Sequence, residues 1–178
     1  NIFKIGCRKV TYTNIQRLLL DGLSPAVKDA IGRQRRLADY LNVNFQKTLS
    51  SERISRMKEH FDKCDFYGNP FPTITNPYLN ILHLNIHKIK IKSSSSKPVM
   101  CPLLTKHRDT EKKIKYNILY KKDDLRKEKI IMNIIVLADT ILKREEDLDL
   151  LISGYNILPV DNQYGFVEII PNSVTLHE

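Results

Sequence analysis

The chain has 178 residues, a length typical of one domain, and its 42% hydrophobic and 28% charged residues exclude intrinsic disorder. Its longest strongly apolar run, Ile130–Ala138, is far shorter than the roughly 20 residues that a membrane-spanning helix needs, so we expect no transmembrane segment. Three separated cysteines show neither a disulfide framework nor a metal-ligand pattern, which indicates a reducing, intracellular compartment. The N-terminus has no initiator Met and no signal peptide, so we expect a segment of a longer protein.

The net charge of +9 is concentrated in the middle of the chain. Residues 85–122 carry 11 basic and 2 acidic residues, whereas residues 123–178 have a net charge of −6. Such a basic block can attract anionic lipid, nucleic acid or a phosphorylated ligand, and it is equally typical of solvated strand faces. It lacks the interleaved aromatic residues on which bases stack, which argues against nucleic acid.

Helical periodicity dominates residues 1–64. Ser24 followed by Pro25 is a helix start signal, and a stripe of apolar residues three or four apart follows it. A further helix is expected after Ser50 and Ser51. The first stripe comprises Val27, Ile31, Leu37, Ala38, Leu41 and Phe45, and the second Ile54, Met57, Phe61 and Cys64. Both stripes favour packing against a core or against another domain, and the turn-forming residues 65–77 predict a connection.

Beyond residue 77 the apolar period changes to two, which predicts strands. The alternation in residues 82–92 slips at His87 and Lys88, which indicates a bulge or bend in one long strand. The next segments predict a turn at residues 93–98, a strand at 99–104, a polar loop at 105–113 and a strand at 114–121.

Asp123 and Asp124 predict the start of a helix, because acidic residues suit the positive end of the helix dipole. Apolar residues dominate Ile130–Leu142 on most sides, so we expect this helix to be largely buried. The remaining pattern predicts a hairpin with strands at residues 155–160 and 165–170.

Ile118–Lys121 followed by Asp123–Glu128 resembles the F-K-x-G-D-D-L-R-Q-D signature of the phosphatidylinositol 3-kinase and 4-kinase superfamily. Leu148–Leu150, Tyr155–Leu158 and Gly165–Ile170 follow in the family's order and spacing. The resemblance covers about residues 74–178. The last of these segments and the residues after it are most similar to the 3-kinase branch, in a class III-like form.

The resemblance implies an α+β fold. We expect a protein-kinase-like N-lobe, with an antiparallel sheet of about five strands and one main helix, preceded by an α-helical region. The implied domains are residues 1–72, the end of a helical domain with the first kinase helices, and residues 73–178, the N-lobe through the hinge.

The family's catalytic loop and metal-binding D-F-G motif do not occur between the hinge and Glu178. Asp65–Gly68 is only superficially similar to D-F-G, because it precedes the whole lobe. The C-lobe is therefore expected to lie outside this sequence. A fragment of this extent would be inactive alone and would hold no metal ligands.

The resemblance implies that Lys121 binds the nucleotide phosphates and that Glu128 replaces the family's Asp as the acid that orients this lysine. Val167, Glu168 and Ile170 form the hinge, with the Glu168 carbonyl and the Ile170 N–H facing adenine. The other implied ATP-binding residues are Ser94, Ser95, Ser96, Lys97 and Pro98 in the phosphate loop, Met100 and Leu119 as apolar walls, and Tyr155 deep in the adenine pocket. The family's two residues between Lys and Asp-Asp are reduced to Lys122, so either Lys121 or Lys122 could supply the ammonium.

The implied function of the parent protein is transfer of the ATP γ-phosphoryl group to the 3-hydroxyl of phosphatidylinositol, with Mg or Mn held by the C-lobe. The resemblance also implies a regulatory subunit and a role in membrane traffic or autophagy-type signalling. The implied location is cytoplasmic, peripheral on endosomal or other intracellular membranes. Two alternatives stay open: a phosphatidylinositol 4-kinase, and a non-catalytic basic module that binds lipid or a partner.

Overall fold

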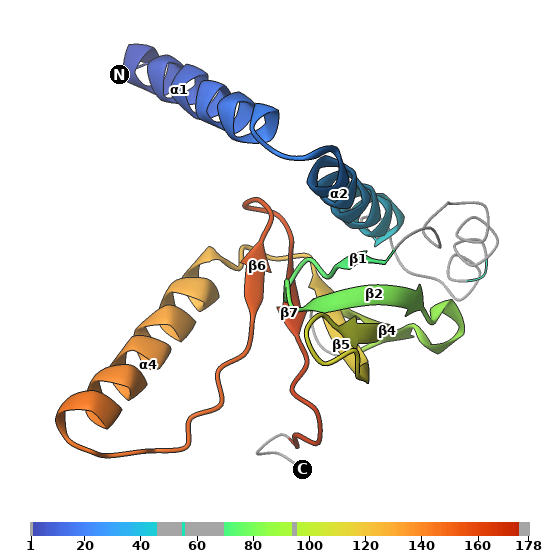
Figure 1. Ribbon diagram of the computed structural model, residues 1–178, viewed down its shortest axis with the longest axis vertical. Helices are drawn as coiled ribbons and strands as arrows, with labels where there is room; N and C mark the ends of the chain where they lie inside the picture. Colours follow the sequence, from blue (N-terminus) through green and yellow to red (C-terminus); the bar gives the residue numbers. More distant parts are fainter. Residues whose placement is uncertain (1, 46–54, 56–69, 94–95, 175–178) are drawn as a thin grey trace.

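The computed structural model consists of helices and one antiparallel sheet (Figure 1). It describes the whole chain except residues 1, 46–54, 56–69, 94–95 and 175–178. The helices α1 (Ile2–Asp21) and α2 (Pro25–Phe45) come first, and α4 (Arg126–Glu145) follows the fifth strand. The structure confirms the predicted α+β fold. The helix expected after Ser51 lies almost entirely outside the described residues.

The sheet runs in the order β1-β2-β4-β5-β7-β6, and β3 pairs with β4 beside β2. All of these pairs are antiparallel. The strands are β1 (Phe71–Pro72), β2 (Leu79–Leu84), β3 (Lys90–Ile91), β4 (Val99–His107), β5 (Lys113–Lys121), β6 (Ile157–Pro159) and β7 (Gly165–Glu168). The long central pair, β4 and β5, therefore forms the frame to which the shorter strands attach.

The predicted bend in the segment 82–92 is confirmed, since a 3₁₀ turn (Ile86–Lys88) separates β2 from β3. The predicted loop 105–113 is too long at both ends, because β4 extends to His107 and β5 begins at Lys113. Thr105 explains the extension: it is fully buried on the core face, and its hydroxyl donates a hydrogen bond to the Ile114 carbonyl at 2.9 Å.

The core lies between α2 and one face of the sheet. Strand alternation turns Cys101, Ile118 and Tyr120 toward this face, where the C-terminal half of α2 packs with its buried Leu37 and Leu41. Polar contacts fix the helix on the sheet, because the Tyr120 hydroxyl donates a hydrogen bond to Asn42 Oδ1 at 2.9 Å. The N-terminal part of the predicted stripe does not reach the core.

Val27 and Ile31 of that stripe are exposed, so they do not belong to the core of this sheet, and packing against another domain stays a prediction for them. The helix contacts the sheet through residues near its C-terminal end, and Gln34 marks this limit by donating to the Pro72 carbonyl at 2.9 Å. The amphipathic period continues along α2, but the sheet lies beneath only part of the helix.

The prediction that the helix after Asp124 is largely buried is also wrong. α4 lies beside β6 rather than across the sheet (Figure 1). Most of its large apolar side chains are exposed. The exposed ones are Ile130, Ile131, Ile134, Val136, Leu137 and Ile141. The helix begins at Arg126, whose backbone N–H donates to Asp124 Oδ1 at 3.2 Å. Within the described ranges, no helix has the length and apolar content to cross a bilayer.

Candidate functional site

The face of the sheet opposite α2 carries a row of partly buried apolar side chains. The strand register places Met100 opposite Leu119, and Leu119 opposite Val167. Residues directly opposite each other in antiparallel strands point to the same face, so the three side chains lie in line across β4, β5 and β7. We call these three residues the apolar row. Their chain neighbours Tyr120 and Phe166 point to the core face and are buried there.

Lys121 lies on the same face, two residues beyond Leu119 in β5. Its Nζ atom is 3.2 Å from Glu128 Oε1 and 3.1 Å from Asp123 Oδ2. Glu128 occupies the first turn of α4, so the start of this helix brings a carboxylate to the end of the strand. The Lys121 side chain is 26% exposed.

The two carboxylates keep Lys121 charged. Partial burial of Lys121 lowers its pKa, but the hydrogen bonds and charges of Asp123 and Glu128 outweigh this effect, so the pKa is raised. The result is a fixed ammonium group next to the apolar row. Strand alternation separates it from Lys122, which is exposed just beyond the end of β5. The geometry therefore favours Lys121 over Lys122 as the cation of this site.

The segment expected to form the hinge is tied to the strands on both sides. Glu168 Oε2 accepts hydrogen bonds from the backbone N–H of Asn156 at 3.0 Å and from Asn156 Nδ2 at 2.8 Å. The Glu168 N–H donates to the Asn156 carbonyl at 2.8 Å, and the Ile169 N–H donates to the Asn117 carbonyl at 3.0 Å. These bonds fix the backbone that leads from Val167 to Ile170.

β3 and β4 pair as a hairpin, in agreement with the turn predicted at residues 93–98. The Lys92 N–H donates to the Pro98 carbonyl at 2.9 Å, and Lys97 adopts a left-handed φ of 41°. Pro98 is buried and Ser96 is partly buried, whereas Ser94 and Ser95 lie outside the described residues. Because the hairpin continues into β4, it stands next to Met100. Phosphate binding by this turn stays a prediction.

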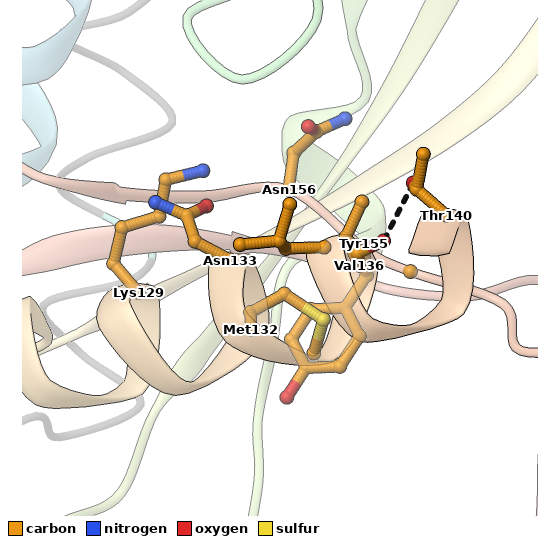
Figure 2. Close-up of a pocket in the computed structure, with 9 residues that line it drawn as sticks. Lys129, Met132, Asn133, Val136, Thr140, Tyr155 and Asn156 are labelled. Atoms are coloured by element: carbon orange, nitrogen blue, oxygen red, sulfur yellow. Dashed lines mark hydrogen bonds between the residues drawn. The ribbon is translucent and has the colours of Figure 1, made fainter. Parts of the chain in front are cut away.

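Tyr155 lines a pocket between α4 and residues 154–156, with a volume of about 420 Å³ (Figure 2). Met132 and Val136 of α4 form part of its wall. The pocket reaches Asn156, the residue that holds Glu168, so it adjoins the hinge segment. Tyr155 is partly buried and belongs to this pocket rather than to the apolar row.

Most of the described site residues predicted from the sequence thus lie on or beside the strands β4, β5 and β7, whereas Tyr155 lies in the adjoining pocket. Two further contributors were missed, Asp123 as the second partner of Lys121 and Asn156 as the anchor of Glu168. The shortened spacing after Lys121 was a signal for Asp123, whereas Asn156 had no signal beyond its place beside Tyr155. In the part of the chain that the structure describes, no three His, Cys, Asp or Glu side chains are grouped to hold a metal ion.

Comparison with known proteins places this geometry in context. Residues 115–178 match the model of the family "Phosphatidylinositol 3- and 4-kinase". The chain is 27% identical over 158 residues to phosphatidylinositol 3-kinase pik3 of Schizosaccharomyces pombe, covering 82% of this chain and 19% of that protein. It is 26% identical over 154 residues to phosphatidylinositol 3-kinase VPS34 of Candida albicans, covering 76% of this chain and 15% of that protein.

A third relative, phosphatidylinositol 3-kinase VPS34 of Arabidopsis thaliana, is 33% identical over 82 residues, which cover 46% of this chain and 10% of that protein. The chain therefore spans less than a fifth of the length of these curated relatives.

Proposed function

We propose that the chain forms the ATP-binding N-lobe of a kinase that phosphorylates the 3-hydroxyl of phosphatidylinositol, because residues 115–178 match the model of the phosphatidylinositol 3- and 4-kinase family. In this proposal the N-lobe comprises residues 73–178, and residues 1–72 form a helical lead-in. The observation that carries it is the Lys121 ammonium, held by Glu128 beside the apolar row. The names of the relatives, all phosphatidylinositol 3-kinases, support the lipid class of the substrate.

The residues of the site fit a nucleoside triphosphate. The apolar row of Met100, Leu119 and Val167 offers a flat wall for the adenine ring. The Glu168 carbonyl would accept a hydrogen bond from the ring, and the Ile170 N–H would donate one. Tyr155, in the adjoining pocket, would lie deep behind the adenine ring. When bound, ATP with Mg or Mn supplies the phosphoryl group that is transferred.

The chain's own contribution to the reaction is charge and position. Lys121 neutralises charge on the phosphates, and Glu128 and Asp123 hold its ammonium in one place. The turn of Ser94, Ser95, Ser96, Lys97 and Pro98 would cover the phosphates from the other side. The residues that bind the metal and accept the proton of the inositol hydroxyl would come from a C-lobe.

The proposed setting follows from the lipid substrate. Phosphatidylinositol is a membrane component, so the protein would act at a cytoplasmic membrane surface, of endosomes or other intracellular compartments, in membrane traffic or autophagy-type signalling. A regulatory subunit would recruit it there. The basic residues of 85–122 support association with an anionic surface.

Replacing Lys121 tests the function and the assignment of the lysine together. The full-length protein that contains this chain is assayed on phosphatidylinositol vesicles with Mg-ATP, and the phosphorylated position of the product is identified. We expect a 3-phosphate product, and we expect Lys121→Met to lower kcat/KM by about a hundredfold or more, because one preorganised charge at the reacting phosphates is lost.

Lys122→Met is the matched control, since it removes a neighbouring ammonium that lies off the site face, and it should retain activity within about threefold. A 4-phosphate product would assign the protein to the sister 4-kinase branch. Folded wild-type protein that binds the vesicles without turnover would contradict the kinase proposal and favour a non-catalytic lipid-binding module.

A further inference from the structure

One lysine near the C-terminal end of α4 bridges two aspartates. The Lys143 Nζ atom lies 2.8 Å from Asp139 Oδ2 and 3.0 Å from Asp149 Oδ1. Asp139 is on the same helix, one turn earlier, whereas Asp149 belongs to the segment that leaves the helix. The bridge therefore connects α4 with the segment that follows it. This segment leads from the end of α4 back to β6 (Figure 1).

Asp139 makes this bridge more than a surface ion pair. It is only 9% exposed on a helix whose apolar residues mostly face outward, and its Oδ1 atom has no hydrogen-bond partner in the described part of the chain. A carboxylate in that environment is unfavourable unless a cation matches its charge. Lys143 is that cation, and its pKa is raised by hydrogen bonds to Asp139 and Asp149.

The returning segment, residues 148–156, lies along α4. The Leu148 N–H donates to the Leu142 carbonyl at 3.2 Å, and the chain reverses its direction from this point. Further along, Gly154 packs so closely on the helix that a Cβ atom there would be 3.1 Å from Val136 Cγ2. The segment is thus attached to α4 at two places, and Tyr155 directly follows the second.

We propose that Lys143 is a positioning residue of the nucleotide site, an inference that rests on the proposed function. α4 carries Glu128 near its N-terminal end, about 22 Å along the axis from Lys143. Because α4 has little packing against the sheet, its few attachments decide where it lies. Bridging to Asp149 fixes the helix against the segment that bears Tyr155. The same bridge thereby holds Glu128 within reach of Lys121.

The test uses Lys143→Met in the full-length protein that contains this chain, with kcat and the KM for ATP measured on phosphatidylinositol vesicles. We expect the KM for ATP to rise about tenfold. Lys143→Arg keeps the bridge and should stay within about twofold of the wild type. Arg144→Met is the matched control, because its ion pair is with the adjacent Glu145 and it should leave the KM unchanged.

A double variant shows whether Lys143 acts through Glu128. If it does, Lys143→Met combined with Glu128→Gln raises the KM no further than Glu128→Gln alone. Additive effects, or a lower unfolding temperature with an unchanged KM, would mean that Lys143 only stabilises the fold and would overturn the proposal.

Amide hydrogen exchange measures the same attachment without catalysis. Lys143→Met should speed exchange in residues 148–156 and in the first turn of α4, whereas Arg144→Met should not. Unchanged exchange in the first turn would overturn the inference whatever the activity. An inactive wild type with the expected exchange pattern would instead refute only the kinase proposal.

Discussion

At the scale of single residues, Gly165 at the start of β7 occupies the tightest position among the described glycines. A Cβ atom there would lie 2.5 Å from the Leu158 carbonyl oxygen and 2.8 Å from Leu125 Cδ1. The carbonyl belongs to the paired strand β6 and cannot move without disturbing the ladder. We therefore expect Gly165→Ala to lower the free energy of unfolding by about 1–3 kcal/mol, measured by urea unfolding of the purified chain.

Gly32 provides the matched control for this substitution. It lies inside α2, and a Cβ atom there meets only the Arg36 guanidinium at 3.6 Å, an ordinary contact. Gly32→Ala should be neutral or stabilising by up to about 1 kcal/mol, because Ala loses less backbone freedom in a helix. Equal effects of the two substitutions would contradict the close packing of β7 on β6.

At the scale of elements, the two ends of α2 differ in their contribution to stability. Leu41 is fully buried in the core, whereas Val27 on the same predicted stripe is 44% exposed. Leu41→Ala leaves a cavity under the sheet and should cost about 2–5 kcal/mol. Val27→Ala should change the free energy of unfolding by less than about 0.5 kcal/mol. Thermal and urea unfolding of both variants measure the difference, and similar losses would show that α2 packs along its whole length.

For the whole molecule, one buried thiol and two largely buried tyrosine hydroxyls determine how the stability changes at high pH. Burial raises the pKa of Cys101 from 9.0 to about 12, and it raises those of Tyr116 and Tyr120 from 10.0 to about 12. Below pH 9 the folded and unfolded chains both hold these protons. Above it the unfolded chain releases protons that the folded chain keeps, so stability must fall as the pH rises toward 12.

We therefore expect the unfolding temperature of the chain to decrease steadily on the alkaline side of pH 9. Tyr120→Phe removes one of the three groups and should make the decrease shallower, although it also removes the hydrogen bond to Asn42 and lowers stability at neutral pH. Differential scanning calorimetry across the alkaline range measures both effects. An unfolding temperature that stayed constant up to pH 12 would contradict the burial of these groups.

Local patterns in the sequence were sufficient for the faces of the strands, whereas they misplaced the ends of β4 and β5. The alternation in residues 114–121 placed Ile118 and Tyr120 on one face and Leu119 and Lys121 on the other, as the structure has them. The bend near residue 87 and the turn before β4 also followed from local signals. Such features depend on the chemistry of neighbouring residues, which a sequence displays directly.

Three features of the site depended on packing between distant segments. α4 has the composition of a buried helix, yet it lies beside β6 with its apolar side chains outward. The contacts of Asn156 with Glu168 and of Lys143 with Asp149 arise because the chain reverses after α4.

By itself, then, the sequence determined the α+β class, the strand faces and the pairing of Lys121 with an acid at the end of β5, because these follow from periodicity and from a motif contiguous in the chain. Only the tertiary structure decided which apolar faces are covered and which polar groups meet across the turn, since burial and long-range hydrogen bonds depend on where whole elements lie.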